Sequence, residues 1–237
     1  MERKTGVERL TSESMSSSTN QHHIVTQYIL KDIKTYMPLY ATGILLDIGC
    51  GNKPYEAIIS PLVKKYIGCD IIQSSKNVVD ILCPATDLGF DDNSFDVVFS
   101  SQVIEHVADH NKMVEETFRV LKVGGYAVFT IPFCWELHEE PFDFFRISKY
   151  GIKDLFERKG FTIELIKANG GKWAAIFQLF LNVLFSARKY NTFRSKIIKL
   201  IFIKLNFITL YNKFAIWIDK KYFDDVLTLN YIVVVKK

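Results

Sequence analysis

Apolar runs of strand length alternate with helical patterns along most of this chain, and this order limits its fold more than any other feature. One helical pattern covers 109–121, and another begins at Ser148 and ends at Gly160. Strands that alternate with helices predict an α/β fold with a mostly parallel sheet that helices cover on both faces. The strand-like runs lie at 44–48, 65–71, 77–82, 95–100, 126–131, 161–167 and 227–235.

Both flanks of this pattern differ from its centre. Residues 1–20 are polar and rich in Ser and Thr, without the apolar region of a signal peptide, so we expect a flexible tail. A helix is expected at about 21–36, and the folded domain at 21–237. The last two strands are separated far more widely than neighbouring strands require, which predicts a helical insertion at about 170–223.

This predicted insertion is apolar and basic. Residues 186–221 contain nine basic residues and one acidic residue, a net charge of +8, whereas the whole chain carries +4. Neither apolar run reaches about 18 uncharged residues, so we expect no transmembrane helix. Basic amphipathic helices suit an anionic membrane surface, here through 173–221. The alternative is an extra helical layer, packed on the domain or on a second copy in a homo-oligomer. We expect no nucleic-acid partner, because apolar rather than small polar residues separate the basic ones.

The cysteines give no sign of disulfides or zinc. They are scattered, with no CxxC spacing and no histidine at ligand spacing: Cys50, Cys69, Cys83 and Cys134. This pattern favours reduced, buried thiols in a cytoplasmic protein, and we predict no metal site.

A glycine-rich turn follows the first predicted strand in ILLDIGCGNKPY, residues 44–55. A phosphate-binding loop would need GxxxxGK[ST], which is absent, and a dinucleotide fingerprint would need a third glycine where Pro54 stands. The turn alone is therefore also explained by a tight strand-to-helix connection. About twenty residues later, however, Asp70 ends the second predicted strand, where a carboxylate can accept both hydroxyls of a ribose.

Four motifs that follow one another along the chain are LDIGCG, YIGCD, DLGFDDNSFDVVFSSQVIEHV and LKVGGYAVFTIP. Together they resemble the motifs of the class I S-adenosylmethionine-dependent methyltransferases, in particular of the type 11 members. The resemblance covers about 40–166 and the final strand. It implies a Rossmann-like sheet of seven strands, mostly parallel with an antiparallel last strand, and S-adenosylmethionine as the cofactor.

The resemblance also implies roles for individual residues. The turn would flank the amino-acid part of the cofactor, Asp70 would hold the ribose, the next residue would pack on adenine, and the end of the fourth strand would line the methionyl side. The predicted cofactor-binding residues are Asp47, Gly49, Cys50, Gly51, Asp70, Ile71, Ala85, Ser101 and Gln102.

Two positions depart from the family pattern. Lys53 stands where the family often has glycine, so the turn could be rebuilt there. Pro84 stands where an acid often accepts from the adenine amino group, which leaves the Ala85 backbone, Asp87 or Asp80 for that task. After the fourth strand, His106 is expected to pack and hydrogen-bond rather than to act as a base.

The acceptor side should be the loop at 131–148, because ligands bind beyond the carboxyl ends of the central strands in such sheets. We predict His138, Asp143 and Arg146 as its catalytic residues. His138 could remove a hydroxyl proton, Asp143 could orient it or act as base, and Arg146 could bind an acidic group. The alternative is a packed lid in which Asp143 and Arg146 merely pair.

This loop resembles a subgroup of methyltransferases associated with bacterial surface glycans and lipid-linked sugars, through HEEPFDFFRISKYGIKDLFERKGF. The sequence thus predicts an enzyme that methylates a hydroxyl of a sugar or glycolipid, in the cytoplasm or at the inner face of the membrane. A methyltransferase of a small lipid or quinone-like acceptor, and a non-catalytic binding module with this fold, are the alternatives.

Overall fold

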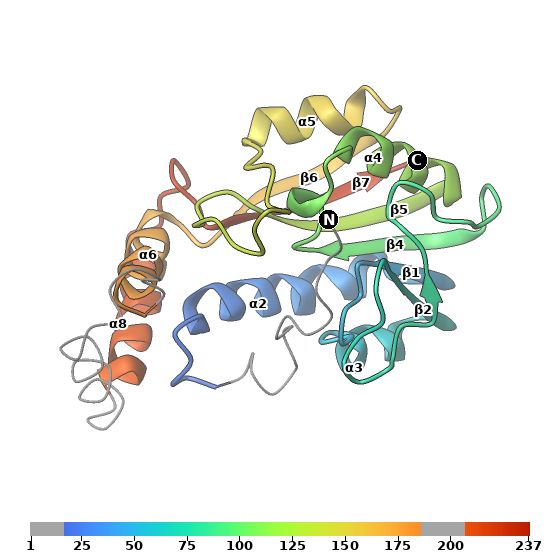
Figure 1. Ribbon diagram of the computed structural model, residues 1–237. Helices are drawn as coiled ribbons and strands as arrows, with labels where there is room; N and C mark the ends of the chain where they lie inside the picture. Colours follow the sequence, from blue (N-terminus) through green and yellow to red (C-terminus); the bar gives the residue numbers. More distant parts are fainter. Residues whose placement is uncertain (1–16, 186–206) are drawn as a thin grey trace.

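The computed structural model describes residues 17–185 and 207–237, which form one seven-stranded sheet with helices on both faces (Figure 1). The strands lie in the order β3 (Ile81–Leu82), β2 (Lys65–Asp70), β1 (Ile44–Ile48), β4 (Phe95–Ser101), β5 (Leu121–Pro132), β7 (Asn230–Lys236) and β6 (Thr162–Asn169).

All strand pairs are parallel except those of β7, which runs antiparallel to both β5 and β6. The predicted fold class is therefore confirmed, including the antiparallel last strand. Strand β6 consequently has the same direction as the central strands, so its carboxyl end lies at the same edge of the sheet as theirs.

Side chains that alternate along the strands build two cores. Leu46 and Val98 point to the face covered by α4 (His110–Val120) and α5 (Lys149–Glu157). Their neighbours Leu45 and Val97 point to the opposite face. That second face is covered by α2 (His23–Tyr40), α3 (Glu56–Ile59), α6 (Lys172–Phe185) and α8 (Phe207–Lys221). Two short 3₁₀ helices, η1 (Ser60–Leu62) and η2 (Ile104–His106), complete the described elements.

Strand β3 is shorter than the run at 77–82 predicted. The Gln73 side chain bonds the backbone of Val79 in both directions, donating to its carbonyl over 3.1 Å and accepting from its N–H over 3.0 Å. These bonds replace a strand ladder, so only Ile81 and Leu82 pair with β2.

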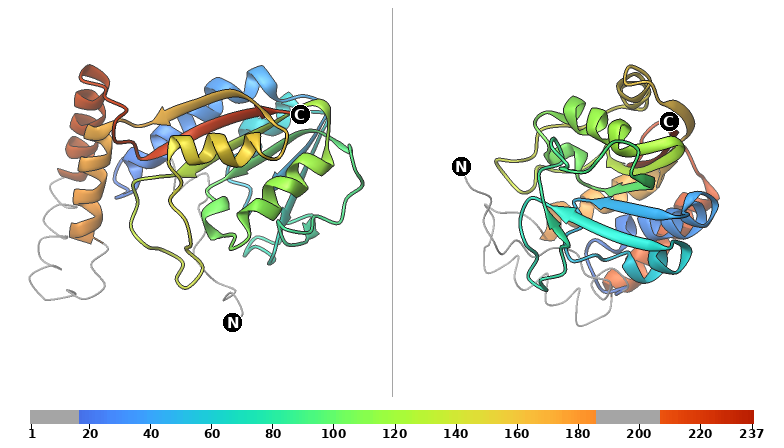
Figure 2. Two further views of the ribbon diagram at one scale, coloured as in Figure 1. Left: turned by 90° about the horizontal axis from the view of Figure 1, so that it is seen from above. Right: turned by 90° about the vertical axis from the view of Figure 1, so that its right-hand side faces the viewer.

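Helices α6 and α8, the helices described between β6 and β7, stand side by side at one end of the sheet (Figures 1 and 2). Their facing sides carry aromatic residues, with the rings of Phe177 and Tyr211 centred 5.1 Å apart. The buried carboxylate of Asp219 on α8 accepts from the Tyr28 hydroxyl of α2 over 2.6 Å and from the Gly171 and Ala174 N–H groups over 3.0 Å each. It thereby joins the end of α8 to the start of α6 and to α2.

Polar residues of α6 make a second connection to α2. Gln178 is fully buried, donates to the Gln21 carbonyl over 2.8 Å and accepts from the Val25 N–H over 3.3 Å. Six of the nine basic residues of 186–221 lie in 186–206, outside the described residues. Within 17–185 and 207–237, no helix combines the length and the apolar character needed to cross a membrane.

Candidate functional site

The glycine turn after β1 keeps a conformation that L-amino acids rarely adopt. Gly49 and Gly51 have φ angles of 73° and 53°. A Cβ on Gly49 would lie only 2.4 Å from Cγ2 of Val103, in the segment after β4. Glycine is therefore required at position 49 both for the backbone angle and for the close approach of the two segments.

Asp70 lies directly beside this turn at the end of β2. Its carboxylate accepts from the Gly51 N–H over 3.1 Å and from the Ile72 N–H over 3.3 Å, and the residue is 5% exposed. Ile71, the next residue, is 52% exposed although it is large and apolar. A fixed carboxylate next to an exposed apolar side chain is the arrangement that a ribose and an adenine ring require.

Lys53 does not rebuild the turn. Its backbone has a φ of 49°, so it adopts the left-handed conformation that glycine would take. The side chain is 7% exposed and its ammonium group lies 2.6 Å from a carboxylate oxygen of Asp80, which also accepts from the Gly68 N–H over 2.7 Å. Gly68 makes room for this arrangement, because a Cβ there would lie 2.7 Å from Cε of Lys53. The Asp80 carboxylate is thus held by the Lys53 ammonium group and the Gly68 N–H.

Two residues of the turn motif are buried rather than open to a ligand. Asp47 accepts a hydrogen bond from the Tyr66 hydroxyl, and burial raises the pKa of its carboxyl to about 7. Burial also raises the pKa of the Cys50 thiol, so this thiol is protonated at neutral pH.

The remaining predicted cofactor residues lie at the same edge of the sheet. Ser101, at the end of β4, shares a hydrogen bond of 2.7 Å with the Thr130 hydroxyl and donates to the Tyr55 hydroxyl over 3.2 Å. Gln102 follows with a φ of 58° and donates to the same threonine over 3.2 Å. Ala85 is partly buried against the first core.

The three predicted catalytic residues are neighbours in the loop between β5 and α5. The side chain of Asp143 is fully buried, and one of its oxygens lies 3.1 Å from Nδ1 of His138 and accepts from the His138 N–H over 2.9 Å. Arg146 donates to both carboxylate oxygens, over 2.6 and 2.8 Å. Although burial acts to raise it, these hydrogen bonds lower the pKa of Asp143 to about 2. Asp143 is thus a permanent carboxylate that orients the imidazole.

Arg146 is occupied by its own loop. Besides Asp143, its guanidinium donates to the backbone carbonyls of Glu136 and Phe145, over 2.9 and 2.8 Å. The pairing considered as an alternative in the sequence is therefore present. The geometry favours a role for Arg146 in shaping the loop around His138.

The loop is fixed to η2, the segment after β4. The Phe144 N–H donates to the Glu105 carbonyl over 2.9 Å, and Nδ1 of His106 donates to the Phe142 carbonyl over 2.7 Å. The imidazoles of His106 and His138 lie with their centroids 4.7 Å apart. The Glu105 side chain is 1% exposed, and burial raises its pKa to about 8. Sequence reasoning missed Glu105, whose signal was its position directly beyond a central strand.

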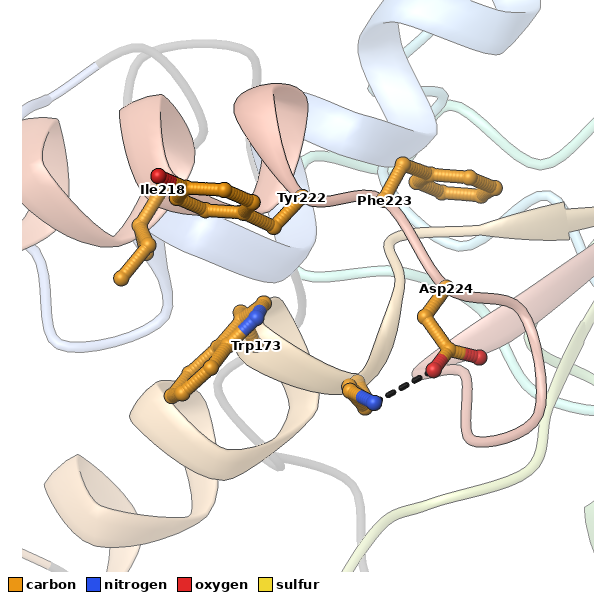
Figure 3. Close-up of a pocket in the computed structure, with 6 residues that line it drawn as sticks. Trp173, Ile218, Tyr222, Phe223 and Asp224 are labelled. Atoms are coloured by element: carbon orange, nitrogen blue, oxygen red, sulfur yellow. Dashed lines mark hydrogen bonds and ion pairs between the residues drawn. The ribbon is translucent and has the colours of Figure 1, made fainter.

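A separate hollow of about 490 Å³ lies at the base of α6 and α8 (Figure 3). The rings of Trp173 and Tyr222 line it, and Lys172 and Asp224 form an ion pair at its rim. None of the predicted site residues lines this hollow.

A family model matches the part of the chain that holds this geometry. Residues 46–129 match the family model described as "Methyltransferase domain". These residues comprise β1 to most of β5 and hold the glycine turn, Asp70 and η2. The match supports a class I S-adenosylmethionine-dependent methyltransferase.

Relatives agree with this family. A probable S-adenosylmethionine-dependent methyltransferase of Mycolicibacterium smegmatis is 29% identical over 134 residues, which cover 51% of this chain and 52% of the relative. A ubiquinone biosynthesis O-methyltransferase of Ruegeria sp. is 30% identical over 110 residues, covering 41% of this chain and 44% of the relative. The chain thus spans about half the length of these two curated relatives.

Solved structures agree on the fold. The structure of a SAM-dependent methyltransferase from Archaeoglobus fulgidus superposes with a TM-score of 0.57 at 16% identity, covering 89% of this chain and 94% of that one. The comparisons support S-adenosylmethionine as the cofactor, and the residues of this chain fit it: a carboxylate for the ribose, an exposed apolar residue for the adenine, and hydroxyl and amide groups at the end of β4.

Proposed function

We propose that this protein transfers the methyl group of S-adenosylmethionine to a hydroxyl of a sugar or a small glycolipid. The observation that carries the proposal is the fixed pair of His138 and Asp143 beyond β5, on the same edge of the sheet as the cofactor residues. A relative named as an O-methyltransferase and the resemblance of the loop to glycan-associated methyltransferases support this class of reaction.

The proposed binding of the cofactor uses the glycine turn and the ends of β2 and β4. Asp70 accepts the ribose hydroxyls, Ile71 covers the adenine, and Ser101 and Gln102 face the methionyl part. Ala85 contributes to the adenine side through its backbone, since Asp80 is held by Lys53. When bound, S-adenosylmethionine supplies an electrophilic methyl carbon on a sulfonium.

In the proposed reaction, a lone pair of the acceptor oxygen forms a bond to the methyl carbon, and the carbon–sulfur bond breaks with its electrons passing to sulfur. The hydroxyl proton has to leave. Nδ1 of His138 lies 3.3 Å from the Glu136 carbonyl and 3.1 Å from the Asp143 carboxylate, and both groups can only accept a hydrogen bond. The proton is therefore placed on Nδ1, and Nε2 of this imidazole carries the lone pair that receives the hydroxyl proton. Arg146 keeps Asp143 charged and in place.

The exposed surface of α6 and α8, called here the α6–α8 surface, supports a location at which the protein would meet such an acceptor. We define it by its large apolar side chains that are 46–71% exposed: Ile176, Phe180, Val183, Leu210, Phe214 and Trp217. Lys213, Lys220 and Lys221 lie on the same helix α8, and the ammonium group of Lys221 lies 5.2 Å from the centre of the Trp217 ring. We propose that this surface contacts an anionic membrane at the face of the bilayer, where apolar side chains enter the interface and lysines attract the headgroups.

A second candidate function is the methylation of a small lipid or quinone-like acceptor. The exposed aromatic side chains of the α6–α8 surface and the similarity to a ubiquinone biosynthesis O-methyltransferase favour it. A non-catalytic binding module would be suggested by the departures from the family pattern at Lys53 and Pro84, but Lys53 fits into the turn with a glycine-like φ angle.

Transfer of radiolabel from S-adenosylmethionine separates these functions. The purified protein is incubated with nucleotide sugars and lipid-linked glycans in one set of reactions, and with phenols and quinols in another. Label on a saccharide supports the proposal, and label on the quinols alone would replace it with the second candidate. No label on any acceptor, together with no binding of S-adenosylhomocysteine by calorimetry, would leave the binding module.

A further inference from the structure

Three metal-ligating side chains converge where the acceptor loop meets η2. One ligand atom each of Glu105, His106 and His138 lies within 4.8 Å of the other two. Within this cluster, Oε1 of Glu105 lies 3.7 Å from Nε2 of His106. Metal–ligand bonds of about 2.0–2.2 Å put neighbouring ligand atoms about 3–3.5 Å apart. Side-chain rotations that move the ligand atoms by about 1 Å would therefore bring all three within bonding distance of one ion.

Both imidazoles are already oriented as metal ligands usually are. Nδ1–H of His106 donates to the Phe142 carbonyl over 2.7 Å, and Nδ1 of His138 lies 3.1 Å from the Asp143 carboxylate. These contacts place the proton on Nδ1 and the lone pair on Nε2. A histidine that ligates a metal almost always donates its other N–H to a backbone carbonyl or a carboxylate, and here one of each is present.

Glu105 supplies an independent observation. Both of its carboxylate oxygens are buried and have no hydrogen-bond partner among the described residues. Burying a carboxyl group without a partner is unfavourable, so such groups in native proteins mark an unseen water or ion or a functional role. The backbone carbonyl of this residue holds the acceptor loop, while its side chain reaches the two imidazoles.

The surrounding charges allow a cation. The guanidinium of Arg146 lies 3.4 Å from Nδ1 of His138, but it is paired through two hydrogen bonds with Asp143. The side chain of His138 is 31% exposed, whereas those of Glu105 and His106 are 1% and 7% exposed. An ion at this position would therefore have its protein ligands on the inner side and open positions toward the acceptor.

We propose that Glu105, His106 and His138 bind one divalent first-row transition-metal ion at the acceptor site. Two imidazoles and one carboxylate are the ligand set that such ions favour, whereas Mg²⁺ favours oxygen ligands alone. The role of this ion rests on the proposed function: a hydroxyl bound at an open position loses its proton more readily. With the ion present, His138 acts as a ligand, and the ion would lower the pKa of the bound hydroxyl so that its proton passes to solvent water.

Metal binding is tested on the full chain, which is first treated with a chelator to remove bound metal and then dialysed to remove the chelator. Calorimetric titration with Zn²⁺ or Mn²⁺ should give one site per chain, and with Mg²⁺ none. Glu105→Gln and His138→Gln should each weaken binding at least 100-fold, and Asp143→Asn about 10- to 100-fold through the orientation of the imidazole. His110→Gln, on a nearby histidine outside the cluster, should bind as the wild type does.

Two results would overturn the proposal: no binding of Zn²⁺ or Mn²⁺ by the wild type, or unchanged binding in His138→Gln. His138 lies in a partly exposed loop, so its variant remains informative even if Glu105→Gln does not fold, which circular dichroism would reveal. Label transfer distinguishes the two proposals. Transfer to a saccharide that chelation leaves unchanged would refute the metal alone, whereas a bound metal without transfer to any hydroxyl would refute the proposed function alone.

Discussion

The Asp70→Ala variant offers the most direct test of the cofactor site. In the free protein the Asp70 carboxylate accepts from two backbone N–H groups, those of Gly51 and Ile72. In the proposed complex it also accepts from the two ribose hydroxyls. A hydrogen bond to a charged group contributes about 1.5–3 kcal/mol, so two of them amount to about 3–6 kcal/mol. Water partly replaces the lost acceptor, so we expect the lower end, which is about a 100-fold weaker affinity.

The assay is isothermal titration with S-adenosylhomocysteine, below the temperature at which the variant begins to unfold. Loss of the two backbone contacts should also lower the free energy of unfolding by about 1–2 kcal/mol, which a urea titration measures separately. Asp91→Asn, an exposed carboxylate on the loop before β4, is the matched control and should bind as the wild type does. Equal affinity of the wild type and a folded Asp70→Ala would refute the assignment of the ribose to β2.

Three further predictions concern catalysis, pH and the membrane. Once an acceptor is known, His138→Gln should lower kcat by about 10²- to 10⁴-fold with unchanged cofactor affinity, and full turnover would remove His138 from the mechanism. Burial gives Asp47 a pKa of about 7 against about 3.9 when unfolded, so its contribution to stability is present below about pH 4 and is lost as the pH rises to about 7. Urea unfolding from pH 4.5 to 7.5 should therefore show a slope that Asp47→Asn lacks, and parallel curves would contradict the raised pKa. Trp217→Ala should reduce co-sedimentation with anionic vesicles several-fold, and added salt should weaken the binding of the wild type. Leu39→Ala, at a large apolar residue of α2 that is even more exposed (68% against 53%), should have no effect. Binding that changes with neither the variant nor salt would reject the membrane surface.

The architecture could be predicted because hydrophobic periodicity encodes it directly. Leu45 and Leu46 are adjacent and equally apolar, and they enter different cores because strand side chains alternate. The helix after residue 109 was predicted from the helical spacing of its apolar residues. In the structure Asp109 caps this helix, with its side chain accepting from the Lys112 N–H. The short β3 could not be predicted, since a glutamine side chain competes for its backbone groups.

The candidate site was predictable only in part. The turn and Asp70 follow from spacing along two neighbouring parallel strands, and their contact in the structure agrees with it. The pairing of Lys53 with Asp80 brings together residues far apart in the sequence, which no local pattern signals. The same holds for Glu105, whose importance depends on a loop that folds back from residue 138. The expectation that no metal binds considered cysteine spacing and therefore could not detect a cluster of this kind.

The hydrogen bonds of the Asp219 carboxylate determine where the chain can tolerate insertions and deletions. Because this carboxylate bonds the N–H groups of Gly171 and Ala174, the end of α8 is fastened to the start of α6, and Lys172 and Asp224 close the same junction. The chain therefore enters β7 at the same position, whatever number of residues separates α6 from α8. If the stretch between α6 and α8 became longer, the entropic cost of closing this loop would rise only with the logarithm of its length. Evolution or a protein engineer could thus exchange that stretch while the register of β6 and β7, and the site at their edge, stay unchanged.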